Sequence, residues 1–344
     1  MEYLNEKKYY PISIKAVEKT GGIQIEFKRK SKSKELAVFC KQLSAMMEAG
    51  MPIINSIDIM MNQTTNKTMK KTLYDIYENL QKGNSFSDSL KKHPYVFPGL
   101  MINMIESGEL SGAMDDVLKK LAIHYEKDAK IMRKIKGAMV YPIILAFAAT
   151  VMVIFMLAFI FPTFVSMFES SGVELPGITR FVMGISDSIK DYWYIHIMVI
   201  VAIVSFYKIY SNTKEGRKAI DGFKLKFPLL KQLNKMIATT RFTRTTATLL
   251  YSGVPLLQAL ENVASIIGNV IYKEGILIIR DEVRRGQELA LPIKRSQLFP
   301  PMVDNMIRIG EESGTLDDIL DKTADYFDEE FEASIQQLTT MFEP

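Results

Sequence analysis

The strongest constraint on this chain is a continuous apolar segment, Gly137–Pro162, which contains no charged residue. A helix needs roughly 20 apolar residues to cross the hydrocarbon core of a bilayer. A buried helix in a soluble core is the alternative, but such helices rarely run this far without a charge. The sequence therefore predicts a transmembrane helix at residues 137–162.

The charges on either side of this segment predict its orientation. The flank before it is basic: Lys127, Lys130, Arg133, Lys134 and Lys136. The flank after it is mostly acidic, with Glu169, Glu174, Asp187 and Asp191 against Arg180 and Lys190. Excess Lys and Arg marks the cytoplasmic side of a membrane. We therefore expect the N-terminal half of the chain to lie in the cytoplasm.

A second, weaker span is predicted at residues 192–210. Tyr192, Trp193 and Tyr194 suit the outer interface, and basic residues from Lys208 to Lys218 follow the inner end. Between the spans, residues 163–191 are expected to form a short extracytoplasmic loop. Residues 211–237 are expected to form a juxtamembrane connector. His196, in the first turn of this span, is interpreted as an interfacial histidine rather than a proton relay.

The segment before the first span has mainly helical patterns. Residues 1–34 contain a predicted β-hairpin (13–17 and 23–27) and a basic linker (28–34). From residue 35 onward, apolar residues recur at helical spacing, and Gly50 with Pro52 separates the first two helices. A helix at 67–81 follows, and another is expected to end before Gly108. The last helix starts near Ala113 and meets no breaker until it enters the span. Residues 35–136 are therefore predicted to form a six-helix cytoplasmic domain.

The chain also contains an internal repeat, which dictates architecture more firmly than local propensity. Gly50-Met51-Pro52 matches Gly253-Val254-Pro255, and Gly83 matches Gly286. The longest match aligns residues 108–118, GELSGAMDDVL, with residues 310–320, GEESGTLDDIL. We therefore expect residues 238–344 to repeat the six-helix fold, so that the protein is all-α with two homologous bundles attached to membrane helices.

The same alignment places Pro344 opposite Pro142, inside the first span. We therefore expect the native protein to continue into a third span and this sequence to be a truncated form. A natural reading frame that stops after Pro344 would contradict this expectation.

With the repeat in view, the chain resembles the PilC/GspF family, the inner-membrane platform proteins of type IV pilus and type II secretion machines. The resemblance covers residues 34–344 and rests on the opening ELAVFCKQL (35–43), on Ala49-Gly50-Met51-Pro52 and on the paired Gly-Glu signatures. The short region before Lys34 and the missing third span depart from the family pattern. The resemblance implies a structural role in pilus biogenesis and protein transport. Its implied partners are a cytoplasmic assembly ATPase, pilin or pseudopilin subunits and other inner-membrane assembly proteins.

No motif in the sequence predicts enzyme activity. There is no Gly-rich phosphate loop with Lys and Ser/Thr, and His93, His124 and His196 are scattered without metal-ligand spacing. Cys40 is the only cysteine, which suits a reducing compartment. We therefore expect no catalytic residue, cofactor or metal. No aromatic stacking pattern accompanies the pair Arg241 and Arg244 or the pair Arg284 and Arg285, so we interpret both pairs as solvated helix faces and expect no nucleic-acid partner.

The acidic signatures are the main candidate sites. The residues singled out, as structural motifs or partner contacts, are Gly50, Pro52, Gly108, Glu109, Gly112, Asp115, Asp116, Gly253, Pro255, Gly310, Glu311, Gly314, Asp317 and Asp318. The favoured interpretation is that the carboxylates interact with the dipole of the sixth helix, while the glycines form a tight turn before it. Contact with a basic patch of the ATPase and binding of a hard cation are the alternatives.

Two other function classes compete with the platform. A transporter or channel needs polar groups inside its spans, and the first span has none. A membrane-tethered scaffold or signalling protein without a filament partner differs from the platform only through the family resemblance. A homo-oligomer is expected, because the paired bundles offer apolar faces that one chain leaves uncovered.

Overall fold

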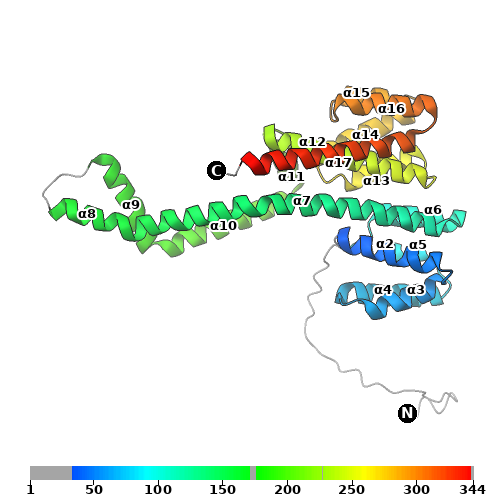
Figure 1. Ribbon diagram of the computed structural model, residues 1–344, viewed down its shortest axis with the longest axis horizontal. Helices are drawn as coiled ribbons and strands as arrows, with labels where there is room; N and C mark the ends of the chain where they lie inside the picture. The colour runs from blue at the N-terminus through cyan, green and yellow to red at the C-terminus, as the bar shows by residue number, and fades with distance from the viewer. Residues whose placement is uncertain (1–32, 171–175, 227, 342–344) are drawn as a thin grey trace, which may run out of the picture.

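The computed structural model describes residues 33–170, 176–226 and 228–341, and every regular element in these ranges is a helix (Figure 1). The chain is all-α, as predicted. The expected hairpin and most of the basic linker lie outside the described residues.

Two six-helix bundles account for most of the structure, in agreement with the repeat. The first bundle consists of α2 (Ser33–Glu48), α3 (Ile53–Gln63), α4 (Lys67–Gln81), α5 (Phe86–Lys91), α6 (Gly99–Ser111) and α7 (Met114–Phe155). The second consists of α12 (Pro228–Tyr251), α13 (Leu256–Ile266), α14 (Val270–Arg284), α15 (Ala290–Ser296), α16 (Pro301–Ser313) and α17 (Leu316–Met341). The second bundle begins ten residues earlier than its expected start at 238.

Apolar side chains that recur at helical spacing in the sequence form the cores of both bundles. Leu36, Phe39 and Leu43 of α2 are buried, and α2 packs along α7. In the second copy α12 packs along α17 in the same way. An equivalent aromatic pair joins the first helix to the residue before α6 or α16, with ring centroids 5.3 Å apart for Phe39–Phe97 and 4.6 Å for Phe242–Phe299. Each fully buried side chain of this size contributes about 1.5–3 kcal/mol.

The third helix of each bundle starts at the same kind of cap. The Asn66 side chain accepts hydrogen bonds from the backbone N–H groups of Thr68 and Met69. Asn269 does the same for Ile271 and Tyr272 at the start of α14. An asparagine oxygen satisfies N–H groups that have no partner within the helix, so it fixes where the helix begins.

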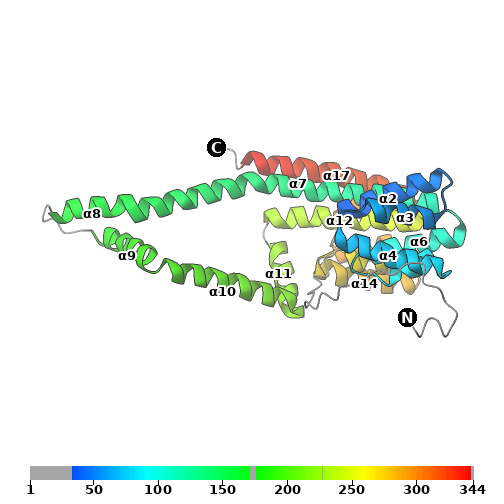
Figure 2. The ribbon, with the colours of Figure 1, turned by 90° about the horizontal axis from the view of Figure 1, so that it is seen from below.

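The first bundle continues into the first candidate membrane span without a break in the helix. α7 runs through Pro142 to Phe155, and the helical path goes on through a π-helical turn, η1 (Met156–Ile160), into α8 (Phe161–Ser170). α10 (Trp193–Asn212) returns toward the bundles. Both apolar segments are exposed along their length, and both are long and apolar enough to cross a membrane. In Figure 2 these helices diverge from the tip formed by α8 and α9.

The segment between the spans is mostly helical, unlike the short loop that we expected. α8 extends to Ser170, and α9 (Gly177–Asp191) lies beside η1. The Ser186 hydroxyl, which is buried, donates to the Leu157 carbonyl oxygen at 2.6 Å. A π-helical turn interrupts the regular i to i−4 bonding, and a polar side chain can then supply a donor to a carbonyl in lipid. α11 (Lys214–Lys226) connects α10 to the second bundle.

Candidate functional site

The glutamates of the two acidic signatures cap a helix other than the one that we expected. The Glu109 carboxylate accepts hydrogen bonds from the backbone N–H groups of Phe86 and Ser87, at 2.6 and 3.0 Å. These groups lie at the start of α5, the fourth helix of the bundle. The expected partner was the sixth helix, whose start is only a few residues away in sequence. The tertiary packing of α6 against α5 therefore decides which N-terminus receives the charge.

The second copy repeats this contact at the same distances. The Glu311 carboxylate accepts from the N–H groups of Leu289 and Ala290, at 2.6 and 3.0 Å, at the start of α15. A carboxylate that bridges two N–H groups at a helix start gains both charge-assisted hydrogen bonds and a favourable dipole interaction. Glu109 therefore joins α6 to α5 in the first bundle, and Glu311 joins α16 to α15 in the second.

The aspartates of the signatures have different surroundings in the two copies. Asp115 and Asp116 lie in the first turn of α7 and are exposed. Asp317 and Asp318 lie in the first turn of α17, beside a cavity of about 210 Å³ between the bundles. The Asp318 carboxylate also pairs with Lys322 at 2.7 Å. No group of three or more His, Cys, Asp or Glu side chains is arranged to hold a metal within the described ranges.

The glycines and prolines of the site list are helix boundaries or contact points. Gly50 and Gly253 share a φ of 77°, and Pro52 and Pro255 directly precede the next helix. Gly112 and Gly314 end α6 and α16 in the left-handed conformation, with φ of 72° and 71°. A side chain is strained there, so these positions favour glycine.

Gly108 and Gly310 have a different role from the turn that we predicted. The expected helix end before Gly108 is wrong, because α6 continues to Ser111 and Gly108 is buried inside it. A Cβ at Gly108 would lie 3.0 Å from a Val117 methyl group, and one at Gly310 would lie 3.0 Å from the Leu316 Cα. These glycines therefore allow the fifth and sixth helices of each bundle to approach closely.

The two bundles meet along a polar seam formed by α6 and α7 on one side and α12, α13 and α17 on the other. The Asn103 amide donates to the Asn262 side-chain oxygen at 2.6 Å, and the Ser107 hydroxyl donates to the Ser252 carbonyl at 2.6 Å. The seam also carries ion pairs, including Lys130–Glu332 at 3.0 Å. Directed polar contacts thus link the two bundles, whose buried apolar side chains belong to one continuous cluster.

Arg244 is the most buried charge in this seam, and its expected solvated position is wrong. Only 5% of its side chain is exposed, and its guanidinium lies 2.6 Å from Asp328, 2.8 Å from Asp325 and 3.3 Å from Asp321. All three carboxylates come from α17. The sequence around Arg244 shows only its own helix, so the acidic face that covers it was not visible in the local pattern.

Burial and ion pairing shift the pKa values of Asp325 and Asp328 in opposite directions. Burial alone disfavours ionised Asp325, but hydrogen bonds from Lys127 and Arg244 outweigh it and lower its pKa. Asp328 is more buried, and burial raises its pKa above the usual range despite the adjacent Arg244. The Arg244 cluster therefore places one readily ionised carboxylate beside one that resists ionisation.

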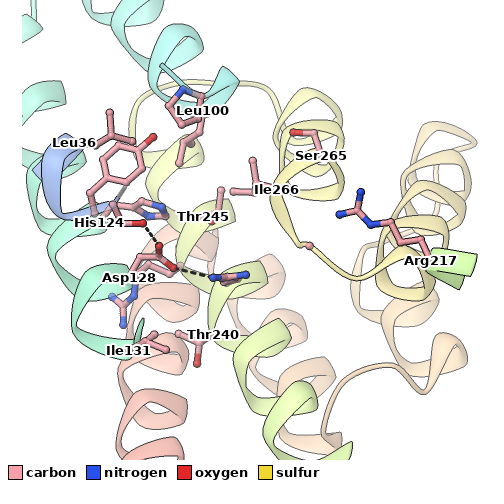
Figure 3. Close-up of a pocket in the computed structure, with 16 residues that line it drawn as sticks. Leu36, Leu100, His124, Asp128, Ile131, Arg217, Thr240, Thr245, Ser265 and Ile266 are labelled. Atoms are coloured by element: carbon pink, nitrogen blue, oxygen red, sulfur yellow. Dashed lines mark hydrogen bonds and ion pairs between the residues drawn. The ribbon is translucent and has the colours of Figure 1, made fainter. Parts of the chain in front are cut away.

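A cavity of about 340 Å³ lies in the seam next to this cluster (Figure 3). Residues of α2, α6, α7, α12 and α13 line it, together with Arg217 of α11. Arg241 reaches across it through Nη2 to the Asp128 carboxylate at 3.3 Å. The Ser33 hydroxyl also donates to Asp128. No single segment of the sequence predicted this cavity, since its walls come from both copies of the repeat.

His124 is enclosed between this cavity and the smaller one beside Asp317. Burial lowers the pKa of its imidazole to about 4, and the positive charges of Arg244 and Arg241 act in the same direction, against Asp128. The ring is therefore neutral near pH 7. In the sequence His124 is an isolated histidine, because the residues that surround it in space are brought together only by the packing of the two bundles.

Comparison with known proteins gives one family throughout. A family model described as type II secretion system (T2SS), protein F matches residues 39–162 and again residues 242–344. The type IV pilus assembly protein PilC of Myxococcus xanthus is 36% identical over 311 residues, which is 90% of this chain and 75% of the relative. The PilC protein of Pseudomonas aeruginosa is 34% identical over 92% of this chain and 85% of its own length. The type II secretion system protein F of the same organism is 31% identical over 100% of this chain and 86% of the relative.

Proposed function

The chain belongs to the family of type II secretion system protein F, and from this premise we propose that it is an inner-membrane platform of a type IV pilus or type II secretion machine. It couples a cytoplasmic assembly ATPase to the insertion of pilin-like subunits into a filament. The names of its relatives, which include pilus assembly and secretion proteins, support this role.

The observation that carries this proposal is the continuity of α7. One helix begins at Met114 at the far end of the first bundle and ends inside the predicted membrane span at Phe155 (Figure 1). The 23 residues between Met114 and Gly137 correspond to about 35 Å of helix outside the membrane. A push or rotation applied to the bundle therefore reaches the bilayer through a rigid element.

The proposed role is structural, without catalysis, cofactors or nucleic acid. The partners are the ATPase, pilin or pseudopilin subunits, other inner-membrane assembly proteins, the lipid bilayer and further copies of this chain. We place the N-terminus and both bundles in the cytoplasm, because the basic flank of α7 lies on their side of the first span.

The contact for the ATPase is proposed at the turn between α6 and α7. This turn lies at the end of the molecule opposite α8 and α9 (Figure 1). Leu110 is 86% exposed there, which is unusual for a large apolar side chain, and the exposed Asp115 and Asp116 follow it. The turn therefore offers a partner one exposed apolar side chain beside two carboxylates. The second copy has Glu312 in place of Leu110, so the two turns differ in polarity.

The test uses the ATPase encoded with this protein and the full-length chain in membranes. We expect Leu110→Glu with Asp115→Arg to abolish crosslinking to the ATPase and filament assembly, while membrane insertion and helix content remain unchanged. The matched control is Asp318→Arg in the second copy, which should retain both activities. An ATPase that assembles and drives filament growth without contacting either bundle would contradict the coupling role and favour a scaffold without a filament partner.

The proposed topology has its own test. Cys40 is fully buried, so engineered cysteines report with little background. A membrane-impermeant maleimide applied to spheroplasts should label Asp187→Cys in α9 and leave Ser111→Cys and Ser313→Cys unlabelled until the cells are lysed. Labelling of the last two in intact spheroplasts would reverse the orientation.

A further inference from the structure

The buried threonines of α12 fall into two groups. Thr239, Thr243, Thr246 and Thr248 donate to the carbonyl four residues earlier, at 2.7–2.9 Å. Thr240 and Thr245 are as deeply buried, yet their hydroxyls have no hydrogen-bond partner. Both of these line the 340 Å³ cavity between the bundles. The unpaired hydroxyls are thus confined to one side of the helix and one space.

Three further buried polar atoms on the wall of this cavity also lack a partner. They are His124 Nδ1, Tyr125 Oη and Arg244 Nε, from residues that are at most 8% exposed. Buried polar groups in folded proteins nearly always have a hydrogen-bond partner, because leaving one unpaired costs free energy. Five such atoms belong to residues that line one cavity, so a polar occupant of this cavity would give them the partners that they lack.

The groups that remain available are mainly hydrogen-bond donors. Arg217 is exposed at the rim, has no partner among the described residues, and points toward Ser265 and Ile266 (Figure 3). The Nη atoms of Arg244 are already paired with the three aspartates of α17, and only its Nε–H is unused. The one carboxylate on the cavity wall, Asp128, is already engaged by Arg241 and Ser33. A ligand rich in acceptor oxygens and negatively charged fits this set, and arginine recognises phosphate oxygens well.

We propose that this inter-bundle cavity binds a small phosphate-bearing molecule, which contacts Arg217, Arg244 and the hydroxyls of Thr240, Thr245 and Tyr125. The cavity volume lies within the range of small-molecule sites. Apolar side chains, Leu36, Leu100, Ile131 and Ile266, line the rest of it, so an organic phosphate fits better than the bare ion. Since both bundles contribute to the wall, the ligand joins them.

The position of the cavity favours a cytosolic ligand over a lipid headgroup. His124 and Asp128 lie 13 and 9 residues before Gly137 on the same helix. At 1.5 Å per residue they are about 14–20 Å from the start of the apolar segment. A headgroup would have to leave the membrane surface to reach them.

The experiment measures binding to the purified full-length protein in nanodiscs by titration calorimetry. The probes are inorganic phosphate, glycerol 3-phosphate and AMP, with phosphatidylcholine as the only lipid. A second set of nanodiscs contains phosphatidylglycerol and no soluble phosphate. For this set, the unfolding temperature of the protein is measured instead of the heat of binding. We expect an organic phosphate to bind more tightly than inorganic phosphate and to raise the unfolding temperature in the first arm.

Two variants and two matched controls locate the site. Arg217→Gln and Thr245→Val remove one charged and one neutral contact, and each should weaken binding by about 10-fold or more. Thr245 makes no internal hydrogen bond, so its replacement by valine leaves the fold intact. Lys218→Gln, the next residue on α11, and Thr246→Val, whose hydroxyl is bonded to its own helix, should leave binding unchanged.

Each outcome decides the proposal. Loss of binding in the two variants but not the controls supports it. A stabilisation that requires phosphatidylglycerol and is lost in the same variants supports the phosphate site and assigns it to a lipid. Absence of binding by every probe, or equal binding by all variants, would overturn it and leave a cavity filled by water alone.

Discussion

The two bundles share their internal caps but differ at the surfaces where they meet. Glu109 and Glu311 make the same pair of hydrogen bonds at the same distances, and Gly112 and Gly314 end their helices with nearly the same φ. These groups act within one bundle, so each copy needs them to close its own fold. Both copies therefore retain the residues that accept hydrogen bonds from the backbone or allow a left-handed turn.

The facing helices α7 and α17 have instead acquired opposite charges. Lys130 and Glu332 occupy equivalent positions of the repeat and pair with each other at 3.0 Å. Arg244, buried under three carboxylates of α17, corresponds to the exposed Lys41 in the first copy. Two identical charges at equivalent positions would repel across the seam. These opposite charges indicate that the two copies are specialised to pair with each other rather than to fold alone.

Removing Arg244 tests this specialisation with the largest expected effect. Arg244→Ala leaves Asp328 buried without its partner and should destabilise the second bundle by about 3 kcal/mol. The equivalent change Lys41→Ala should cost no more than about 0.5 kcal/mol, since that side chain is solvated. Native-state hydrogen exchange measures the opening free energy of each bundle separately. Equal losses in the two variants would show that the seam adds nothing to the second copy.

The pH dependence of stability should also separate the copies. The pKa of His124 falls from its ordinary 6.5 to about 4 in the folded state, so below pH 6.5 the unfolded chain binds a proton that the folded chain does not. Its contribution is complete above pH 6.5 and is lost as the pH falls toward 4. Between pH 6.5 and 5 the first bundle should lose about 2 kcal/mol from this group.

Urea unfolding of the wild type and His124→Gln at the two pH values isolates the effect. The variant should lack this part of the pH slope, while carboxylate titrations remain common to both proteins. The equivalent residue in the second copy is Tyr326, which is 43% exposed, so no histidine occupies this position there. An identical slope in the wild type and the variant would show that His124 is solvated.

The glutamate caps should respond equally in both copies. Glu109→Ala and Glu311→Ala each leave two backbone N–H groups without their acceptor and should cost about 2 kcal/mol. Hydrogen exchange at the starts of α5 and α15 should accelerate in the matching variant only. ATPase binding should persist in both variants, because the carboxylates face inward. Loss of binding without loss of protection would instead assign these residues to the partner.

Alanine substitutions at Gly108 and Gly310 compare the helix packing of the two bundles, with a smaller expected loss of stability. In Gly310→Ala the new methyl group meets the backbone Cα of Leu316 at 3.0 Å, whereas in Gly108→Ala its nearest contacts are side-chain atoms of Val117 and the nearest backbone atom is 3.4 Å away. A backbone atom moves less readily, so Gly310→Ala should cost about 2 kcal/mol and Gly108→Ala about 1 kcal/mol. Thermal unfolding ranks the two. The reverse order would mean that α17 shifts more freely than α7.

Reversing charges across the seam gives the smallest expected change. Lys130→Glu places two negative charges at equivalent positions and should cost about 0.5 kcal/mol, since both side chains are partly exposed. Glu332 also pairs with Lys134, so a charge swap would break a second contact. A double-variant cycle with Glu332→Ala avoids this, and Lys130→Glu should cost less when Glu332 is absent. Salt at about 0.5 M should reduce the difference by screening. An equal cost of Lys130→Glu with and without Glu332 would exclude direct pairing.

The sequence alone determined most helices of the bundles, the repeat and the two candidate membrane segments. Local patterns suffice for these, because a helix is defined by periodic side chains, Asn66 caps its own helix, and Gly137–Pro162 is uncharged over a length that can cross a membrane. The helix that continues from the first bundle into the span followed from the absence of any breaker.

Only the tertiary structure decided which surfaces meet. Glu109 caps α5 instead of the nearby α7, α9 packs against η1 where a loop was expected, and Arg244 lies inside the seam instead of in solvent. Each of these contacts joins residues between 22 and 84 positions apart, where periodicity carries no information. The repeat predicted two similar bundles, but the buried polar seam between them depends on how their differing faces pack.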